Sequence, residues 1–238
     1  MVKPYSTEKT KKEEVAEMFN NIAHKYDFLN HFFSLGIDKL WRKKAIRLLS
    51  KKNPKRILDL ATGTGDFAIA ACKIKPEEVI GADISSGMVE IGQKKVEKKG
   101  LGEICQLEIG DSEDLRFVDN YFDALTVGFG VRNYGNLEKG LSEMLRVVKP
   151  GGQLAILEFS KPEKFPIKQL FNFYFKVVMP VFGNWFSKDS RAYTYLPESV
   201  NAFPYGEKFK GILESLGYKN VRIIPLTGGI ASIYLCEK

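Results

Sequence analysis

Short apolar runs alternate with longer segments of mixed polarity through the middle of the chain. Apolar runs of this length, bounded by turn residues, are typical of strands buried in a parallel sheet. We therefore predict five strands, which are RILDLA, EVIGADI, ICQLEIGD, FDALTVGFGV and QLAILEFS. Helices are predicted after the first, second and fourth runs, to about Lys75, to Lys99 and over Leu137 to Val148. Strands separated by such helices predict parallel βαβ units.

The two ends of the chain follow different patterns. Roughly the first fifteen residues are rich in charge and predict a frayed arm. Helical periodicity then extends from about Glu13 to Ser50, with one apolar face formed by Val15, Met18, Phe19 and Ile22. Near the other end, a helix is predicted over Glu207 to Leu216. The two runs that follow it, YKNVRIIPL and GIASIYLCEK, predict an antiparallel hairpin across Thr227-Gly228-Gly229.

Length and composition predict one substantial α/β domain. The chain has 238 residues, of which 44% are hydrophobic. It lacks a run of about 18 uninterrupted apolar residues, so no transmembrane helix is predicted. The N-terminus lacks an apolar core segment, so no secretory signal is predicted. Cys72, Cys105 and Cys236 are odd in number without metal-binding spacing, which favours reduced thiols and a cytoplasmic location.

The net charge of +7 is compatible with a nucleic-acid partner, an anionic membrane surface or a lysine-rich solvated surface. Basic residues are scattered among acids in runs such as KKEEVAEMF and GQKKVEKKG, which favours the solvated surface. Aromatic residues are not interleaved with basic ones in the manner of RNA-binding motifs, so no nucleic-acid partner is predicted. A peripheral membrane contact and a second copy of the chain stay open as partners.

The stretch ILDLATGTGDFAIAA contains a glycine loop between the first strand and its helix. Gly63 and Gly65 satisfy the pattern G-x-G-x-x-A, in which the backbone approaches a ligand and the helix offers N–H donors. A plain turn is the alternative. Asp59 precedes Gly63 by four positions, where its carboxylate can orient the loop and accept hydrogen bonds from an ammonium group. Asp59 and Asp66 would repel a pyrophosphate, which weighs against a dinucleotide.

Further candidates follow the next three strands. Asp83 ends the second strand about 20 residues past the loop, where an acid suits ribose hydroxyls. Asp111 and Ser112 follow the third strand, where a carboxylate can reach an adenine amino group, and Gly128 ends the fourth. Acids at these positions suit a cationic, phosphate-free ligand such as S-adenosylmethionine. Capping of the following helices is the alternative for each acid.

Three longer elements resemble a known family. They are YDFLNHFFSLGIDKLW (residues 26–41), FGVRN (129–133) and RVVKPGGQLAILEFS (146–160). Together they resemble the UbiE/MenG family, the C-methyltransferases of ubiquinone and menaquinone biosynthesis. The resemblance covers essentially the whole chain, from MFNNIAHKYD to GIASIYLCEK. One departure is Asp38, where the first signature usually carries a histidine, and this weighs against a catalytic histidine there.

The resemblance and the strand pattern imply an α/β fold of the class I S-adenosylmethionine-dependent methyltransferases. This fold is Rossmann-like, with a seven-stranded, mostly parallel sheet, an antiparallel C-terminal strand and an N-terminal helical lid. We expect a single domain divided into the lid (1–50), the cofactor-binding core (55–160), an aromatic substrate or membrane insertion (161–206), and a C-terminal helix and β-hairpin (207–238). For the cofactor, the resemblance implies Thr64, Asp83, Asp111 and Ser112.

The implied reaction moves a methyl group from the sulfonium to a ring carbon of a polyprenylated quinol, without a metal. Details such as ATGTGDF and SLGID resemble the members of the family that make only menaquinone, so the resemblance implies 2-demethylmenaquinol as substrate, converted to menaquinol in the last step of menaquinone biosynthesis. The benzoquinol precursor of ubiquinone is the alternative substrate. Three other interpretations are disfavoured. The family-like elements speak against an enzyme of this fold that acts on a sterol, phospholipid or phenol, and the acidic strand ends with Arg132 speak against a non-catalytic S-adenosylmethionine-binding subunit. The KPGG motif and the antiparallel tail speak against an NAD-dependent oxidoreductase.

Four residues are catalytic candidates. Arg132 can stabilise a phenolate oxygen and polarise a water, and Asn133 can hydrogen-bond a quinol oxygen. In the lid, Tyr26 is expected to contact the carboxylate end of the methionine moiety, and Asp27 to position it or accept a proton. A surface ion pair is the alternative for Arg132, and helix packing or capping for Tyr26 and Asp27. The only histidines, His24 and His31, are expected to be partly buried lid residues, with a proton relay near neutral pH as the alternative.

The stretch after Lys161 is dense in aromatic residues. A long prenyl tail needs an apolar trough, so these residues are expected to line it or to lie in a lipid interface; they are Phe165, Phe171, Phe173, Tyr174, Phe175, Phe182, Trp185 and Phe186. Anionic headgroups would be favoured by Lys161, Lys164, Lys168 and Lys176. A helix burying its aromatics on the core is the alternative. The expected location is the cytoplasm, with peripheral contact at the inner face of the membrane.

Overall fold

Seven strands form one sheet in the structure, a computed structural model that describes residues 2–174 and 191–238. The strand order is β3-β2-β1-β4-β5-β7-β6, with β1 to β5 parallel and β7 antiparallel to both of its neighbours. The strands are β1 (Arg56–Leu60), β2 (Glu78–Asp83), β3 (Cys105–Ile109), β4 (Phe122–Gly128), β5 (Val148–Phe159), β6 (Lys219–Leu226) and β7 (Ala231–Glu237). This arrangement confirms the predicted fold class.

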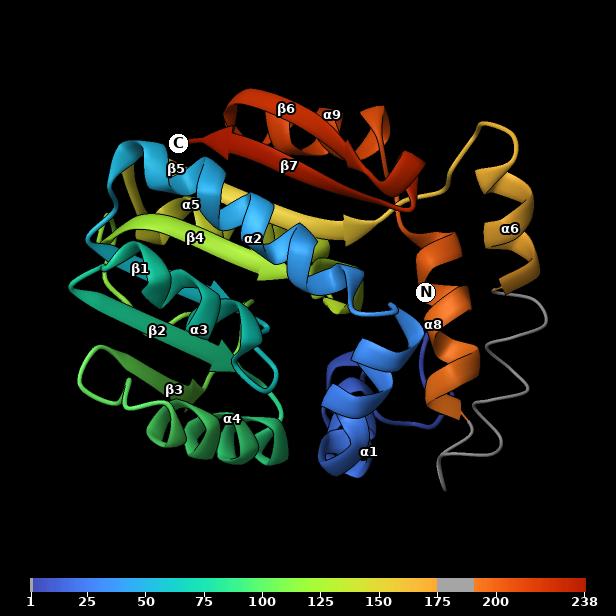
Figure 1. Ribbon diagram of the computed structural model, residues 1–238, viewed down its shortest axis with the longest axis horizontal. Helices are drawn as coiled ribbons and strands as arrows, with labels where there is room; N and C mark the ends of the chain where they lie inside the picture. The colour runs from blue at the N-terminus through green and yellow to red at the C-terminus, as the bar shows by residue number, and fades with distance from the viewer. Residues whose placement is uncertain (1, 175–190) are drawn as a thin grey trace.

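Helices cover both faces of the sheet (Figure 1). One face packs on α2 (Ile37–Leu49), α3 (Asp66–Ala71) and α4 (Ser86–Lys98), and the other on α5 (Leu137–Val147) and α9 (Glu207–Ser215). Successive residues of β1 alternate between these two cores, because Ile57 faces α2 and α3 whereas Leu58 and Leu60 face α5 and α9. Burial on both faces explains why the strands read as apolar runs.

The carboxyl ends of the parallel strands point toward α1 (Lys11–Phe33), α6 (Ile167–Phe173) and α8 (Arg191–Ala202) (Figure 1). Short helical turns join the larger elements; they are η1 (Ser50–Lys52), η2 (Cys72–Ile74), η3 (Val131–Asn133) and η5 (Thr227–Gly229), the last of which closes the predicted hairpin. Ligands of open α/β sheets bind at this carboxyl edge. In this chain α1, α6 and α8 therefore cover the edge where the site is expected.

The N-terminal segment differs from its prediction as a frayed arm. Helix α1 begins at Lys11, and the side chain of Glu14 is fully buried. Its carboxylate accepts hydrogen bonds from the backbone N–H groups of Tyr5, Ser6 and Thr7 at 2.7, 3.0 and 2.6 Å. The prediction was wrong because a charged residue that binds backbone donors reads in sequence like a solvated one.

The aromatic insertion is described only in part. Phe171 is buried on the molecule, but Phe165 and Phe173 are 81% and 60% exposed, so burial on the core does not account for the whole segment. The expectations for Phe175, Lys176, Phe182, Trp185 and Phe186 lie outside the described residues. Within the described part of the chain, every helix is too short or too polar to cross a membrane.

Candidate active site

The glycine loop turns sharply between β1 and α3. Gly63 and Gly65 have φ values of 57° and 78°, a left-handed conformation that glycine adopts without strain. The N–H of Gly63 donates to Asp83 Oδ2 at 2.8 Å, and the N–H of Ser85 donates to Asp83 Oδ1 at 2.8 Å. Burial raises the pKa of Asp83. This carboxylate therefore ties the loop to the end of β2 and fixes the position of both.

A small cleft of about 70 Å³ lies between this loop and α1. We call it the cofactor cleft. It brings together five of the eight residues predicted to bind the cofactor, namely Gly63, Asp83, Asp111, Ser112 and Gly128. Lys12 of α1 closes one end, since its Nζ lies 2.5 Å from Asp111 Oδ2. The cleft is therefore bounded by acids on the sheet side and by α1 on the other.

The other three predicted residues lie behind the cofactor cleft. Asp59 is fully buried, and its two oxygens accept hydrogen bonds from Thr62 Oγ1 at 2.5 Å and Thr126 Oγ1 at 2.6 Å. Burial raises the pKa of Asp59 to about 6. Its carboxylate thus orients the loop through Thr62 and does not line the cleft, where it was expected to bind an ammonium group of the ligand. The Oγ1 of Thr64 donates to Asp27, and Gly65 caps the N-terminus of α3.

A second, larger cavity of about 610 Å³ adjoins the cofactor cleft. We call it the apolar cavity. The two share Phe19, Tyr26 and Phe129 in their walls. Its lining comes from α1, α2, η3, α6, α8 and the turn after β6, and is largely aromatic and aliphatic; it includes Met18, Ile22, Leu35, Ile37, Trp41, Phe159, Ile167, Leu170, Phe171, Phe173, Tyr195 and Ile230. The apolar cavity therefore offers space for a bulky apolar group beside the cleft.

Arg132 lies in the wall of the apolar cavity with its side chain 8% exposed. Its Nη1 donates to Glu158 Oε1 at 2.8 Å and also to the carbonyl oxygen of Phe129. The alternative of a surface ion pair is wrong, because Glu158 is fully buried. The Nε of Arg132 is buried and has no hydrogen-bond partner among the described residues. The guanidinium carbon lies 5.5 Å from the centre of the Phe159 ring.

Asn133 lines the cofactor cleft beside Arg132. Its Oδ1 accepts a hydrogen bond from the hydroxyl of Tyr195 at 3.1 Å, and its Nδ2 donates to the carbonyl of Phe129 at 3.4 Å. Burial raises the pKa of Tyr195 to about 12, so this hydroxyl stays protonated near neutral pH. The amide of Asn133 is thus held between α8 and the end of β4.

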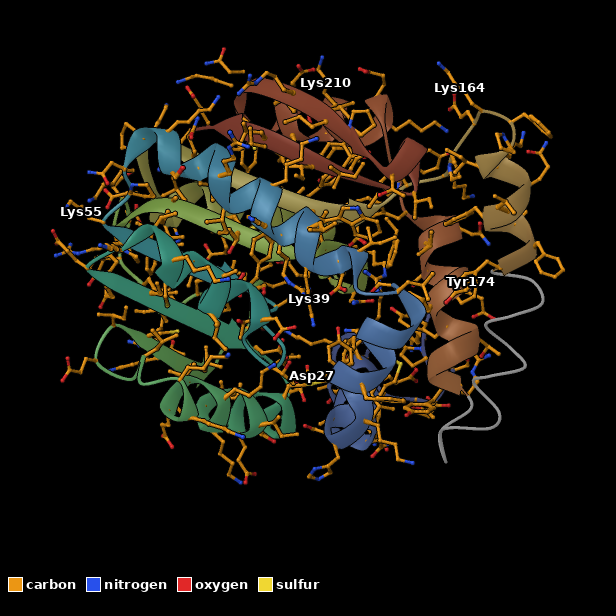
Figure 2. All side chains as sticks on the ribbon, in the orientation of Figure 1. Asp27, Lys39, Lys55, Lys164, Tyr174 and Lys210 are labelled. Carbon is orange, nitrogen blue, oxygen red and sulfur yellow. The ribbon has the colours of Figure 1, made fainter. Side chains whose placement is uncertain are left out.

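Tyr26 and Asp27 point to different neighbours because they are consecutive on a helix. Tyr26 lines both cavities, and burial raises the pKa of its hydroxyl. Asp27 lies on the side of α1 that faces α3 and α4 (Figure 2). Its Oδ1 accepts from Thr64 Oγ1, and its Oδ2 lies 2.7 Å from Lys95 Nζ. Both carboxylate oxygens of Asp27 therefore bind other parts of the protein.

Comparison with known proteins decides the family. A sequence model of the ubiE/COQ5 methyltransferase family matches residues 7–238. The chain belongs to this family. A protein of Bacteroides fragilis named demethylmenaquinone methyltransferase is 51% identical over all of this chain and 97% of its own length. A protein of Geotalea daltonii named ubiquinone/menaquinone biosynthesis C-methyltransferase UbiE is 45% identical, over 96% of this chain and 97% of its own.

Solved structures agree on the fold. A putative S-adenosylmethionine-dependent methyltransferase of Methanococcus maripaludis aligns over 100% of this chain and 97% of its own, at 18% identity and a TM-score of 0.65. A putative O-methyltransferase of Nostoc punctiforme aligns over 98% of this chain and 64% of its own, at 13% identity and a TM-score of 0.70. At these identities the likeness concerns the fold alone.

Asp38, the departure from the usual ubiE/COQ5 signature, lines the apolar cavity and is buried. Its carboxylate accepts a hydrogen bond from Ser34 Oγ at 2.6 Å and pairs with Arg42, which also lies 3.1 Å from Asp66 Oδ2. His24 is exposed, so its predicted partial burial is wrong, and the side chain of His31 lies outside the described residues. In the described ranges, no three His, Cys, Asp or Glu residues are arranged to hold a metal ion.

Sequence reasoning missed the residues that join separate elements at the site. Lys12 and Lys95 looked like members of solvated charge runs, yet they bind Asp111 and Asp27. Glu158 read as part of an apolar strand, yet it binds Arg132. The available signal for Glu158 was a single acid inside the run QLAILEFS, because such an acid requires a buried partner.

Proposed function

We propose that this protein transfers a methyl group from S-adenosylmethionine to a ring carbon of 2-demethylmenaquinol, forming menaquinol in the last step of menaquinone biosynthesis. The observation that carries the proposal is the junction of the cofactor cleft with the apolar cavity at Phe19, Tyr26 and Phe129. A methyl donor in the first and a prenylated ring in the second would meet there. The name of the Bacteroides fragilis relative at 51% identity supports the same reaction.

In this proposal, S-adenosylmethionine supplies an activated methyl group on a sulfonium, and the core of residues 55–160 holds it. Asp83 can accept hydrogen bonds from the ribose hydroxyls, since its position is fixed by Gly63 and Ser85. Asp111 and Ser112 border the adenine end, and Gly128 the methyl end. The lid of residues 1–50 covers the cleft through Tyr26, which is placed to contact the methionine end.

The ring carbon must become nucleophilic before it can accept the methyl group. Loss of a quinol hydroxyl proton moves negative charge onto the adjacent carbon, so the reduced quinol is the expected substrate. Arg132 stabilises the resulting oxyanion, because a guanidinium remains charged and donates directional hydrogen bonds. Asn133, held by Tyr195, orients the ring through one of its remaining hydrogen-bonding positions. From the described parts of residues 161–206, Phe171, Phe173 and Tyr195 contribute to the aromatic wall of the substrate site.

The mouth of the apolar cavity supports a peripheral membrane contact. Leu35, Leu170 and Phe173 line this cavity and are also 82%, 63% and 60% exposed. Lys164 and Lys168 lie on the same segment and are exposed, with Lys164 at the outer end of the loop before α6 (Figure 2). Apolar side chains flanked by lysines suit the surface of an anionic bilayer, from which a prenylated quinol can enter.

Flotation with vesicles that contain anionic lipid tests the membrane contact. The unaltered protein should float at low salt, whereas Leu35→Asp and Phe173→Asp should remain in the dense fraction. Val118→Asp is the control, because Val118 is 68% exposed but lies near the start of β4. Equal flotation of all the variants, or none by the unaltered protein, would remove this part of the proposal.

The reaction itself is tested with the pure protein, S-adenosylmethionine and a short-chain demethylmenaquinone under reducing conditions. Mass spectrometry should detect one added methyl group, and the product should disappear when the reductant is left out. Absence of product with intact cofactor binding would shift the assignment to the benzoquinol precursor of ubiquinone. The 45%-identical Geotalea daltonii relative, whose name includes both quinones, favours that second candidate. Binding without turnover on either quinol would leave the non-catalytic subunit.

A further inference from the structure

Glu158 is a fully buried acid to which the proposed methyl transfer assigns no role. It is the last but one residue of β5 and lies opposite Ser232 of β7. Its Oε1 accepts from Arg132 Nη1 at 2.8 Å and from the N–H of Phe159 at 2.8 Å. A buried carboxylate is costly unless its partner has good geometry, and here the partner is the arginine of the site.

We propose that Glu158 is a positioning residue for Arg132 and that it balances the positive charge of this guanidinium beside the reacting quinol. The proposal rests on the proposed function, because it concerns the oxygen that Arg132 stabilises there. Glu158 does not line the cavity, so it acts through Arg132 and touches no substrate.

The contacts of Arg132 show how its orientation is set. Glu158 and the carbonyl of Phe129 both bind Nη1, and the Phe159 ring lies beside the guanidinium. The backbone oxygen of Arg132 accepts from Lys11 Nζ at 2.9 Å, which fixes the turn from the lid side. Nε is then a buried donor without a partner in the described part of the chain. Arg132 lines the cavity through the 8% of its side chain that is exposed, so an oxygen of a quinol there would accept from the part of the guanidinium that faces the cavity.

The charge of the pair explains why a carboxylate is used. An unpaired guanidinium would lower the pKa of a bound quinol further, but it would also draw charge away from the ring carbon that must attack. With Glu158 ionised, Arg132 offers a directed hydrogen bond while the pair adds no net charge. Removal of the negative charge should therefore make the bound quinol more acidic and at the same time less nucleophilic.

The test compares Glu158→Gln with Glu158→Asp. We would measure kcat against pH with reduced short-chain demethylmenaquinone, the Kd for S-adenosylmethionine by calorimetry, and the melting temperature. In Glu158→Gln, the pH at which kcat is half-maximal (the midpoint) should fall by about one unit. The maximal kcat of the pH profile (the plateau) should fall about tenfold. Glu158→Asp keeps the charge but shortens the side chain, so it should lower the plateau and leave the midpoint in place. Cofactor affinity should change in neither variant.

Glu237→Gln is the matched control, because Glu237 is a strand glutamate that pairs with Lys52 at 2.7 Å, outside both cavities. It should change neither the midpoint nor the plateau. A lower plateau without a shift of midpoint in Glu158→Gln would reduce Glu158 to a structural role and overturn the proposal. If Glu158→Gln does not fold, the result for Glu158→Asp tests the proposal. An unchanged plateau or a shifted midpoint of kcat in Glu158→Asp would overturn the proposal.

A second readout separates this proposal from the proposed function. The probe is 4-methoxy-1-naphthol, which has one ionisable hydroxyl and cannot be oxidised to the quinone without losing its methyl ether. Its absorbance reports the pKa of the bound hydroxyl without turnover. That pKa should fall by about one unit in Glu158→Gln and stay in place in Glu158→Asp. If the unaltered protein fails to methylate the naphthoquinol, the proposed function fails, while an unshifted probe pKa in Glu158→Gln overturns the role of Glu158.

Discussion

Lys95 of α4 and Asp27 of α1 form an ion pair with 2.7 Å between Nζ and Oδ2. The same Nζ lies 2.6 Å from Asp66 Oδ1 at the start of α3 and 3.2 Å from Thr64 Oγ1 in the glycine loop. One ammonium group of α4 therefore joins α1, the glycine loop and α3. Both oxygens of Asp27 are bound in this network. Asp27 is therefore better placed to fix α1 against the glycine loop and α4 than to accept a proton.

Replacement of Lys95 by Met should weaken cofactor binding without changing the chemical step. Lys95 and Asp27 are about a quarter and a third exposed, so we expect a loss of about 1 kcal/mol, or roughly fivefold in Kd for S-adenosylmethionine. Calorimetry measures the Kd, and a single-turnover assay at saturating cofactor measures the step. Lys94→Met is the control, because Lys94 pairs with Glu90 on the open surface. Equal losses of affinity for S-adenosylmethionine in Lys95→Met and Lys94→Met would rule out a role of the Lys95–Asp27 pair in cofactor binding.

The positions of the acids at the strand ends could be predicted from sequence. In a parallel sheet the carboxyl ends of the strands share one edge, so the location of Asp83 and Asp111 follows from the strand assignment alone. Both line the cofactor cleft. The direction in which a side chain points is harder to predict, as Asp59 shows, because Thr62 and Thr126 turn its carboxylate into the core.

Contacts between distant segments could not be predicted. Lys12 lies 99 residues from Asp111, and Lys95 lies 68 residues from Asp27, so neither partner is visible in a local pattern. A lysine in a charged run carries the same signal whether it is solvated or paired across a cleft. The apolar cavity could be predicted only in part: the expected aromatic residues Phe171, Phe173 and Tyr174 line it, whereas the rest of its wall comes from distant elements such as α1, α2 and α8.

Asp83→Asn should reduce affinity for S-adenosylmethionine by about ten- to a hundredfold. An amide keeps the size of the side chain but loses one acceptor, so it cannot bind Gly63, Ser85 and two ribose hydroxyls together. The Kd for S-adenosylhomocysteine should rise in parallel, since the two molecules share the ribose. The control is Asp119→Asn on the surface, where the acid is 66% exposed. An unchanged Kd in Asp83→Asn would remove this residue from the cofactor site.

Asp59 should make the protein less stable as the pH rises through its pKa. Burial raises this pKa to about 6 in the folded state, against about 3.9 in an unfolded chain, so the folded state holds the proton more tightly. The stabilisation by this proton is complete below about pH 4 and is lost by about pH 6, with a size of roughly 2–3 kcal/mol. Urea unfolding at several pH values should show that Asp59→Asn gains stability relative to the unaltered protein across this window. A constant difference between pH 4 and 7 would contradict the raised pKa.

Loss of Arg132 should have separate effects on stability and on chemistry. Arg132→Ala leaves Glu158 buried without its cation, so we expect a loss of about 3–5 kcal/mol in the free energy of unfolding. The double variant Arg132→Met with Glu158→Leu removes both charges and should recover most of that loss. Both variants should reduce kcat by at least about a hundredfold, because no guanidinium remains to stabilise the quinolate, while the Kd for S-adenosylmethionine stays within about threefold. Denaturant melts and methyl-transfer assays on the same preparations distinguish the two effects. Full activity in the stable double variant would exclude Arg132 from the reaction.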